Sequence, residues 1–142
     1  RIARRQRQMC IRDSVEAYKK LDTETEKIQE LKKYFIRELR KSVDFKINGS
    51  INKSSHTILN ILWPINIKKK PILNFKLDME GIACSAGSAC QSGSDKPSHV
   101  LSEILDSDAM KNISLRFSFS KLNKKDEVDK VVNFLNKFID EN

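Results

Sequence analysis

The most constraining feature of this sequence is a strict alternation of apolar and polar residues between positions 113 and 119. Apolar side chains occupy every second position, at Ile113, Leu115, Phe117 and Phe119. Successive side chains of a β-strand point to opposite faces, so a period of two places these side chains on one face. The segment therefore predicts a half-buried strand, and a layer of other elements must cover its apolar face.

Two long segments have the apolar period of a helix and can provide this cover. In residues 15–41, apolar side chains recur at helical spacing, at Ile28, Leu31, Phe35 and Leu39. A last helix is predicted from about Lys125, with an apolar face of Val128, Val131, Val132, Leu135 and Phe138. The order of helix and strand patterns predicts an α/β fold class, a small sheet covered by helices.

Shorter elements are predicted between these two helices. The expected strands cover residues 45–47, 57–63 and 82–84, and the expected helices cover residues 72–79 and 97–105. Pro64 is expected to close the second strand, and Asn48-Gly49 is expected to form a turn. Gly81 is a natural C-terminal cap for the first of these helices, and residues 85–94 are expected to form a loop.

Composition limits the class of protein. The chain has 142 residues, of which 39% are hydrophobic and 32% charged, as expected for one soluble globular domain. No apolar run approaches the roughly 20 residues that span a bilayer, so we expect no membrane association. Three cysteines without a regular spacing exclude a disulfide scaffold and favour a reducing compartment, which here means the cytoplasm.

The basic N-terminus is interpreted as non-native. Residues 4–14 match one translated frame of a transposon-type sequencing adapter, so residues 1–14, including Cys10, are set aside as an expected artefact. The net charge of +8 invites a nucleic-acid-binding hypothesis, in which the arginines of this segment would contact phosphates. Without the segment, the remaining 128 residues carry 22 basic and 18 acidic side chains, a net charge of +4. We therefore expect no nucleic-acid partner, and we expect the natural N-terminal portion to be missing.

The segment between residues 81 and 94 has an unusual composition. Small residues flank Cys90 on both sides, and such a segment offers little side-chain surface for packing. A structural cysteine prefers a buried apolar site, so this setting leaves both a reactive and an incidental Cys90 open. Cys84 follows Ile82-Ala83, and its simplest interpretation is a small core residue.

Other site chemistries receive little support. Cys84 and Cys90 lack the second ligand pair that a zinc site requires, and we expect no bound metal. A phosphate-binding loop would need a lysine that is absent here. Nothing in the sequence links His56 or His99 to Cys90 as in a cysteine protease, and both histidines are interpreted as structural.

Three segments, in order and spacing, carry a family resemblance. They are Ser85-Ala86-Gly87-Ser88-Ala89-Cys90, Pro97-Ser98-His99-Val100-Leu101 and Ser114-Leu115-Arg116-Phe117-Ser118. Together they resemble the C-terminal region of cysteine desulfurases of the NifS/IscS type, which have the class V aminotransferase fold. The resemblance runs from about Glu26 to the end of the chain. Ala86 stands where the family usually has the second serine of Ser-Ser-Gly-Ser-Ala-Cys, a conservative departure.

The resemblance implies a function for two residues. Cys90 matches the catalytic cysteine, whose thiolate attacks the sulfur of L-cysteine held on pyridoxal phosphate and becomes a persulfide, leaving L-alanine. Arg116 matches the arginine that receives the substrate α-carboxylate, for which a guanidinium is suited. The family's cofactor-binding residues lie in a large domain, so residues 15–142 are expected to be a C-terminal domain that is inactive alone. The implied partners are a sulfur-acceptor or iron–sulfur scaffold protein, with tRNA thiolation as another destination, and a second subunit in a homodimer.

Several alternatives stay open at this point. A lyase of the same fold, such as a selenocysteine lyase, would share most of these residues. A sulfur-relay domain would use Cys90 without a cofactor. A small basic nucleic-acid-binding module would keep strongly salt-dependent binding after removal of residues 1–14.

Overall fold

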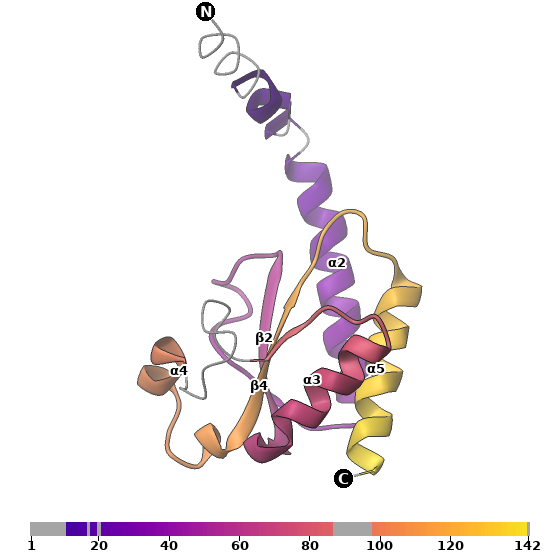
Figure 1. The fold of residues 1–142 in the computed structure, drawn as a ribbon. Coiled ribbons are helices and arrows are strands. Elements are labelled where there is room, and N and C mark those ends of the chain that lie inside the picture. The colour runs from indigo at the N-terminus through magenta and orange to yellow at the C-terminus, as the bar shows by residue number, and fades with distance from the viewer. Residues whose placement is uncertain (1–10, 17, 20, 87–97, 142) are drawn as a thin grey trace, which may run out of the picture.

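A four-stranded antiparallel sheet lies at the centre of the computed structural model, which describes residues 11–16, 18–19, 21–86 and 98–141 (Figure 1). Its strands lie in the order β1-β2-β4-β3. They are β1 (Lys46–Ile47), β2 (Ile58–Asn66), β3 (Ser85–Ala86) and β4 (Asn112–Ser118). The predicted small sheet is therefore confirmed, and the alternating segment forms one of its two central strands.

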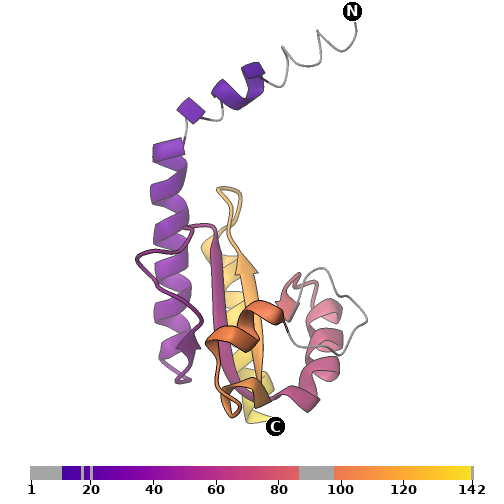
Figure 2. The ribbon, with the colours of Figure 1, turned by 90° about the vertical axis from the view of Figure 1, so that its left-hand side faces the viewer.

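The helices are divided unequally between the two faces of this sheet. They are α2 (Leu21–Arg40), α3 (Lys70–Met79), α4 (His99–Ile104) and α5 (Lys125–Asp140). Helices α2, α3 and α5 lie on one side, and the short α4 lies on the other (Figures 1 and 2). Among the helices that the structure describes, three therefore cover one face of the sheet and α4 alone lies on the other.

The main core fills the space between the sheet and the three longer helices. Its helical side includes Ile28, Leu31, Phe35, Leu39, Leu73, Leu77, Val128, Val132, Leu135 and Phe138. Its strand side includes Leu59, Ile61, Trp63, Ile113, Leu115 and Phe117. The Phe35 ring packs 4.9 Å from Phe117 and 5.7 Å from Phe119, measured between ring centroids. The apolar periods of two and 3.6 therefore meet in one buried layer, as the sequence predicts.

The end of β2 differs from the prediction. Pro64 does not close the strand, which continues to Asn66. The pairing between β2 and β4 shifts between Trp63 and Asn66, and Pro64 lies at this irregularity with an exposed side chain. A strand tolerates proline at a bulge because no ladder hydrogen bond is required of its nitrogen.

The third strand also lies elsewhere than predicted. Residues 82–84 are not in a strand; the pairing with β4 begins at Ser85, within the segment expected to be a loop. Ile82 and Cys84 pack against the core, which explains their apolar character without strand pairing. Gly81 ends α3 as predicted, with a φ angle of +68° that an L side chain adopts at a cost.

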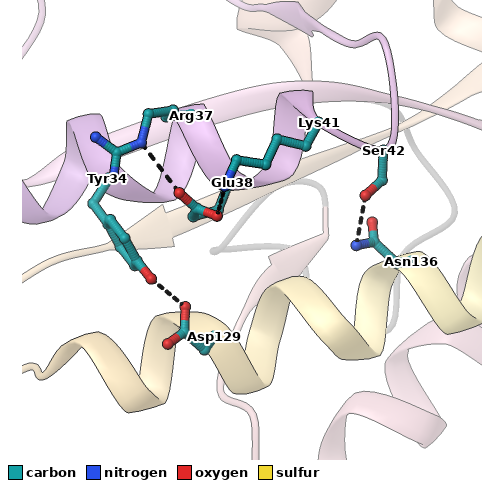
Figure 3. A network of polar contacts seen from close by, with 7 residues as sticks. All are labelled: Tyr34, Arg37, Glu38, Lys41, Ser42, Asp129 and Asn136. Carbon is teal, nitrogen blue, oxygen red and sulfur yellow. Dashed lines mark hydrogen bonds and ion pairs between the residues drawn. The ribbon is translucent and has the colours of Figure 1, made fainter.

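Polar contacts connect the two long helices α2 and α5 at the surface (Figure 3). The Tyr34 hydroxyl donates a hydrogen bond of 2.7 Å to Asp129, which raises the pKa of the phenol. Farther along, the Asn136 amide donates to the Ser42 hydroxyl at 3.0 Å. These contacts set the two helices side by side on the covered face of the sheet.

A buried lysine attaches α2 to the segment between β1 and β2. Lys32 is 6% exposed, and its ammonium group donates to the Ser54 hydroxyl at 3.3 Å and to two backbone carbonyl oxygens. These are the carbonyls of Ser55, at 2.9 Å, and of Ile58, at 2.7 Å. Burial lowers the pKa of Lys32, because a charged ammonium loses hydration there. The three oxygen atoms replace water around the ammonium and hold this segment on α2.

The N-terminal end of the described chain is helical but outside the core. Residues 11–16 form a helical segment that extends away from the sheet together with the start of α2 (Figures 1 and 2). Ile11, Val15 and Tyr18 are exposed there. Among the described helices, none is long and apolar enough to cross a membrane.

Candidate functional site

Of the two predicted site residues, Cys90 and Arg116, the structure describes only Arg116. Cys90 lies outside the described residues. Arg116 lies near the middle of β4, on the sheet face opposite to the main core. Ser85 of β3 is its direct cross-strand partner, and Cys90 follows four residues after Ala86, the last residue of that strand.

Arg116 belongs to a row of polar residues that crosses all four strands. Its partner on β2 is Asn60, and the backbone nitrogen of Asn48 donates to the Asn60 carbonyl at 2.9 Å. The row Asn48–Asn60–Arg116–Ser85 therefore lies on one face, because directly opposite residues of antiparallel strands point to the same side. We refer to these four residues as the polar row.

Side-chain hydrogen bonds order one end of the polar row. The Asn48 amide nitrogen donates to the Asn60 side-chain oxygen at 3.0 Å and to the Ser114 hydroxyl at 3.2 Å. Ser114 is 9% exposed and lies two residues from Arg116 on β4. The Asn60 side-chain oxygen is thus bound by Asn48, the residue directly after the edge strand β1.

The Arg116 side chain has no acidic partner among the residues that the structure describes. It is half-buried, and its cross-strand neighbours Asn60 and Ser85 are neutral. A guanidinium carries five N–H donors and can bind a carboxylate with two parallel hydrogen bonds. Its chemistry suits an anion supplied from outside the described part of the chain.

The next residues along this face lie on the side where α4 is placed. Leu62 and Leu101 are both buried, yet neither belongs to the main core. Leu62 is the direct partner of Ser114, and α4 carries Leu101 (Figure 2). Leu62, like the polar row, therefore lies on the sheet face opposite to the main core.

Cys84 precedes Ser85 and packs against the main core, on the other side of the sheet from the polar row. It is half-buried against the main core, and its thiol donates a weak hydrogen bond of 3.7 Å to the Arg116 carbonyl. Burial raises the pKa of the Cys84 thiol to about 12, although this bond and the Arg116 charge act in the other direction. A thiol with this pKa stays protonated at neutral pH, so Cys84 does not have the properties of a nucleophile. The interpretation of Cys84 as a small core residue agrees with this placement.

The described residues do not provide a metal site. They contain no group of three or more His, Cys, Asp or Glu side chains that could hold a metal ion. Pyridoxal phosphate requires a lysine with a free amino group. Lys32, the buried lysine in the described part of the chain, uses its ammonium for three oxygen atoms of its own fold. The Lys32 ammonium is therefore not available to hold this cofactor.

The histidines interpreted as structural are far apart in the fold. His56 lies within 3.5 Å of the Thr25 hydroxyl, near α2, whereas His99 is exposed in the first turn of α4. Asn48 and Asn60, by contrast, were not predicted as site residues. The polar Asn60 within the apolar run Thr57–Trp63 was the available signal, but the register that places it opposite Arg116 is not visible in one sequence.

Comparisons with known proteins agree with this fold. The family model for aminotransferase class V matches residues 11–131. The chain is 34% identical over 121 residues to the cysteine desulfurase IscS of Dictyoglomus turgidum, covering 84% of this chain and 30% of that protein. It is also 34% identical over 125 residues to IscS of Clostridium botulinum, covering 87% of this chain and 31% of that protein.

Solved structures share the fold. A NifS-like protein has a TM-score of 0.68 at 19% identity, covering 89% of this chain and 31% of that one. The NifS-like protein of Rickettsia africae has a TM-score of 0.62 at 20% identity, with coverages of 86% and 31%. The chain thus spans slightly less than a third of the length of these relatives. The match over most of its own residues shows that the chain belongs to the class V aminotransferase family.

Proposed function

We propose that this chain is the C-terminal domain of a pyridoxal-phosphate-dependent cysteine desulfurase. The net reaction converts L-cysteine and the Cys90 thiol into L-alanine and a Cys90 persulfide. The carbon–sulfur bond of the substrate breaks, a sulfur–sulfur bond to Cys90 forms, and the former thiol-bearing carbon gains a proton. Similarity to IscS proteins over most of the chain supports this reaction, and the position of Arg116 is the single structural observation that carries it.

Arg116 binds the α-carboxylate of the substrate. Arg116 lies on the sheet face opposite to the main core, and among the described residues it has no acid to neutralise it. A bidentate guanidinium–carboxylate pair fixes orientation as well as position. The amino acid is thereby held at a defined distance from the strand that leads to the nucleophile.

Cys90 is the nucleophile and Cys84 is not. Four extended residues span at most about 14 Å, so Cys90 starts within reach of the face that carries Arg116. Its neighbours in sequence are small, which suits a thiol that collects sulfur at one site and delivers it at another. Cys84 lies against the core with its pKa raised to about 12, so the two cysteines have separate roles.

The remaining components lie outside this chain. Pyridoxal phosphate is held by a preceding large domain, where it supplies the electron sink that labilises the bonds of the amino acid. The complete protein is a cytoplasmic homodimer that passes its sulfur to an acceptor or iron–sulfur scaffold protein or toward tRNA thiolation. Residues 1–14 are a non-native addition to this domain.

The test uses the full-length polypeptide that contains this chain, loaded with pyridoxal phosphate. Incubation with L-cysteine is expected to yield alanine and to add 32 Da to the peptide that contains Cys90, as ~32 Da is the mass of one sulfur atom retained as persulfide. The Cys90→Ala variant loses both products of turnover. Cys84→Ala is the matched control and keeps them, because a protonated core thiol takes no part in the reaction.

Other outcomes would contradict this assignment. Alanine formed from selenocysteine but not from cysteine would indicate the lyase alternative. A persulfide on Cys90 in protein that has never contained pyridoxal phosphate would indicate a sulfur-relay domain. The 142-residue chain alone is expected to lose all added pyridoxal phosphate on dialysis, and stoichiometric retention would show that this chain does hold the cofactor.

A further inference from the structure

Two hydrogen-bond donors lie next to each other in the polar row. Asn60 and Arg116 are direct partners on β2 and β4, and such partners have Cβ atoms about 5 Å apart. Both side chains are half-buried on the face that the three long helices leave open. A guanidinium offers hydrogen-bond donors only, whereas an amide has an acceptor oxygen and a donor nitrogen. Which of these two atoms of Asn60 is available therefore decides which ligand the pair can bind.

Asn48 settles the orientation of that amide. The Asn48 nitrogen donates to the Asn60 side-chain oxygen at 3.0 Å, so the acceptor end of the Asn60 amide is occupied within the fold. The amide nitrogen of Asn60 is the end that stays available for a further acceptor. The same Asn48 nitrogen donates to Ser114 at 3.2 Å, which anchors Asn48 to β4 across the intervening strand.

The amide nitrogen of Asn60 has no acceptor among the residues that the structure describes. The register places Asn60 directly opposite Arg116, whose side chain also has no hydrogen-bond or ion-pair partner among the described residues. An interior strand position flanked by Leu59 and Ile61 would favour a β-branched or aromatic residue over asparagine. A half-buried pair of donors calls for an acceptor with two oxygen atoms.

We propose that Asn60 donates a hydrogen bond to the same substrate carboxylate that Arg116 binds, and that Asn48 is a positioning residue that keeps Asn60 in the donating orientation. This assignment rests on the proposed function for the identity of the carboxylate. It deepens that function, because two donors from different strands fix the plane of the carboxylate and with it the direction of the substrate side chain. An amino acid whose carboxylate is replaced by a neutral group would lose both contacts.

A binding experiment on the 142-residue chain tests this without any turnover. Propionate, compared with chloride at equal ionic strength, is expected to shift the NMR signals of the Asn60 side-chain amide and the Arg116 Nε–H. Asn60→Ala is expected to weaken propionate binding about fivefold, the value of one hydrogen bond to a charged group that is partly exposed. Asn48→Ala is expected to have a smaller effect, because it removes the orientation of the donor and not the donor itself.

Ser118→Ala is the matched control, since Ser118 is exposed on the same face of β4, two residues from Arg116. It should bind propionate as the unmodified chain does. If Asn60→Ala does not fold, Asn60→Val keeps a good strand former at this position and also removes the hydrogen-bond donor. Unchanged propionate binding in the folded variant, or no response of the two signals to propionate, would overturn the proposal.

The full-length enzyme separates this inference from the proposed function. There, Asn60→Ala is expected to raise KM for L-cysteine about tenfold with a smaller change in kcat, because the contact exists in both bound states. An equal KM in the variant and the unmodified enzyme would contradict a role for Asn60. If the unmodified enzyme forms neither alanine nor persulfide, the proposed function fails, and the propionate experiment still decides whether Asn60 and Arg116 bind a carboxylate.

Discussion

The two faces of the sheet differ in what their residues do. On one face, Leu59, Trp63 and Phe117 are buried against three helices. On the other face, Asn60 and Arg116 lie in the polar row. The cross-strand partners of Arg116 there, Asn60 and Ser85, are neutral. These two sets alternate along the same two strands, so one backbone carries both.

This difference shows how a short strand can separate stability from chemistry. Because side chains of β4 alternate, the residues that pack in the core are separated by residues that lie on the opposite face, Arg116 among them. The buried residues of β2 and β4 fix the backbone from which Asn60 and Arg116 project on the other face. Substitutions on the two faces should therefore change different measured quantities.

The largest stability effect is expected on the covered face. Trp63 is fully buried, and Trp63→Ala should lower the free energy of unfolding by about 3–5 kcal/mol, through lost burial and a cavity. Ser118→Ala on the open face should change it by less than about 0.5 kcal/mol. Urea denaturation of both variants measures this, and similar losses for the two would show that the faces are not divided in this way.

A buried charge provides the next contrast. Lys32→Met removes the ammonium from three oxygen atoms and should lower the free energy of unfolding by about 1–3 kcal/mol. Lys33→Met changes an exposed neighbour on the same helix and serves as the control, with an effect near zero. Equal stability of the two variants would mean that Lys32 does not hold the β1–β2 segment on α2.

Alkaline pH should affect Cys84 through the covered face. Its pKa is about 12 in the folded chain against 9.0 for an ordinary thiol, so the unfolded chain loses this proton first. The contribution to stability is complete below about pH 9 and is lost as the pH rises toward 12. Cys84→Ala should therefore show a shallower loss of stability between these values, and an unchanged alkaline limb would contradict the burial of the thiol.

The smallest effect is expected at the helix surface. Tyr34→Phe removes the hydrogen bond to Asp129 and should lower the free energy of unfolding only slightly, since both side chains meet water. Thermal unfolding measures the change, with Tyr18→Phe as a control on an exposed tyrosine outside the core. If Tyr34→Phe lowered the free energy of unfolding as much as Trp63→Ala does, the surface contact between the helices would be as important for stability as the core.

The long periodic elements could be predicted from the sequence. The alternation at 113–119 and the helical periods in α2 and α5 are repeated over several turns or residues, and each repeat agrees with burial in the structure. Gly81 was predictable for a separate reason, because a positive φ angle at a helix end favours glycine.

The remaining features depend on pairing between distant strands. Ser85–Ala86 is a strand because it pairs with β4, and its own residues have no strong strand preference. Pro64 stays within β2 because the register shifts there, which the sequence does not encode locally. The polar row has the same origin: Asn60 and Arg116 are 56 positions apart, and only the register brings them together. Cys90 and Arg116 were predictable as site residues through their family motifs alone, and those assignments stay predictions.

Arg116→Lys in the full-length enzyme tests the division between the two faces most directly. Lysine keeps the charge and loses the planar pair of donors, so kcat/KM for L-cysteine should fall about 100-fold. The free energy of unfolding should change by less than about 1 kcal/mol, because Arg116 lies outside the main core. Unchanged kcat/KM, or a loss of activity that only follows a loss of stability, would contradict the assignment of the open face to the substrate carboxylate.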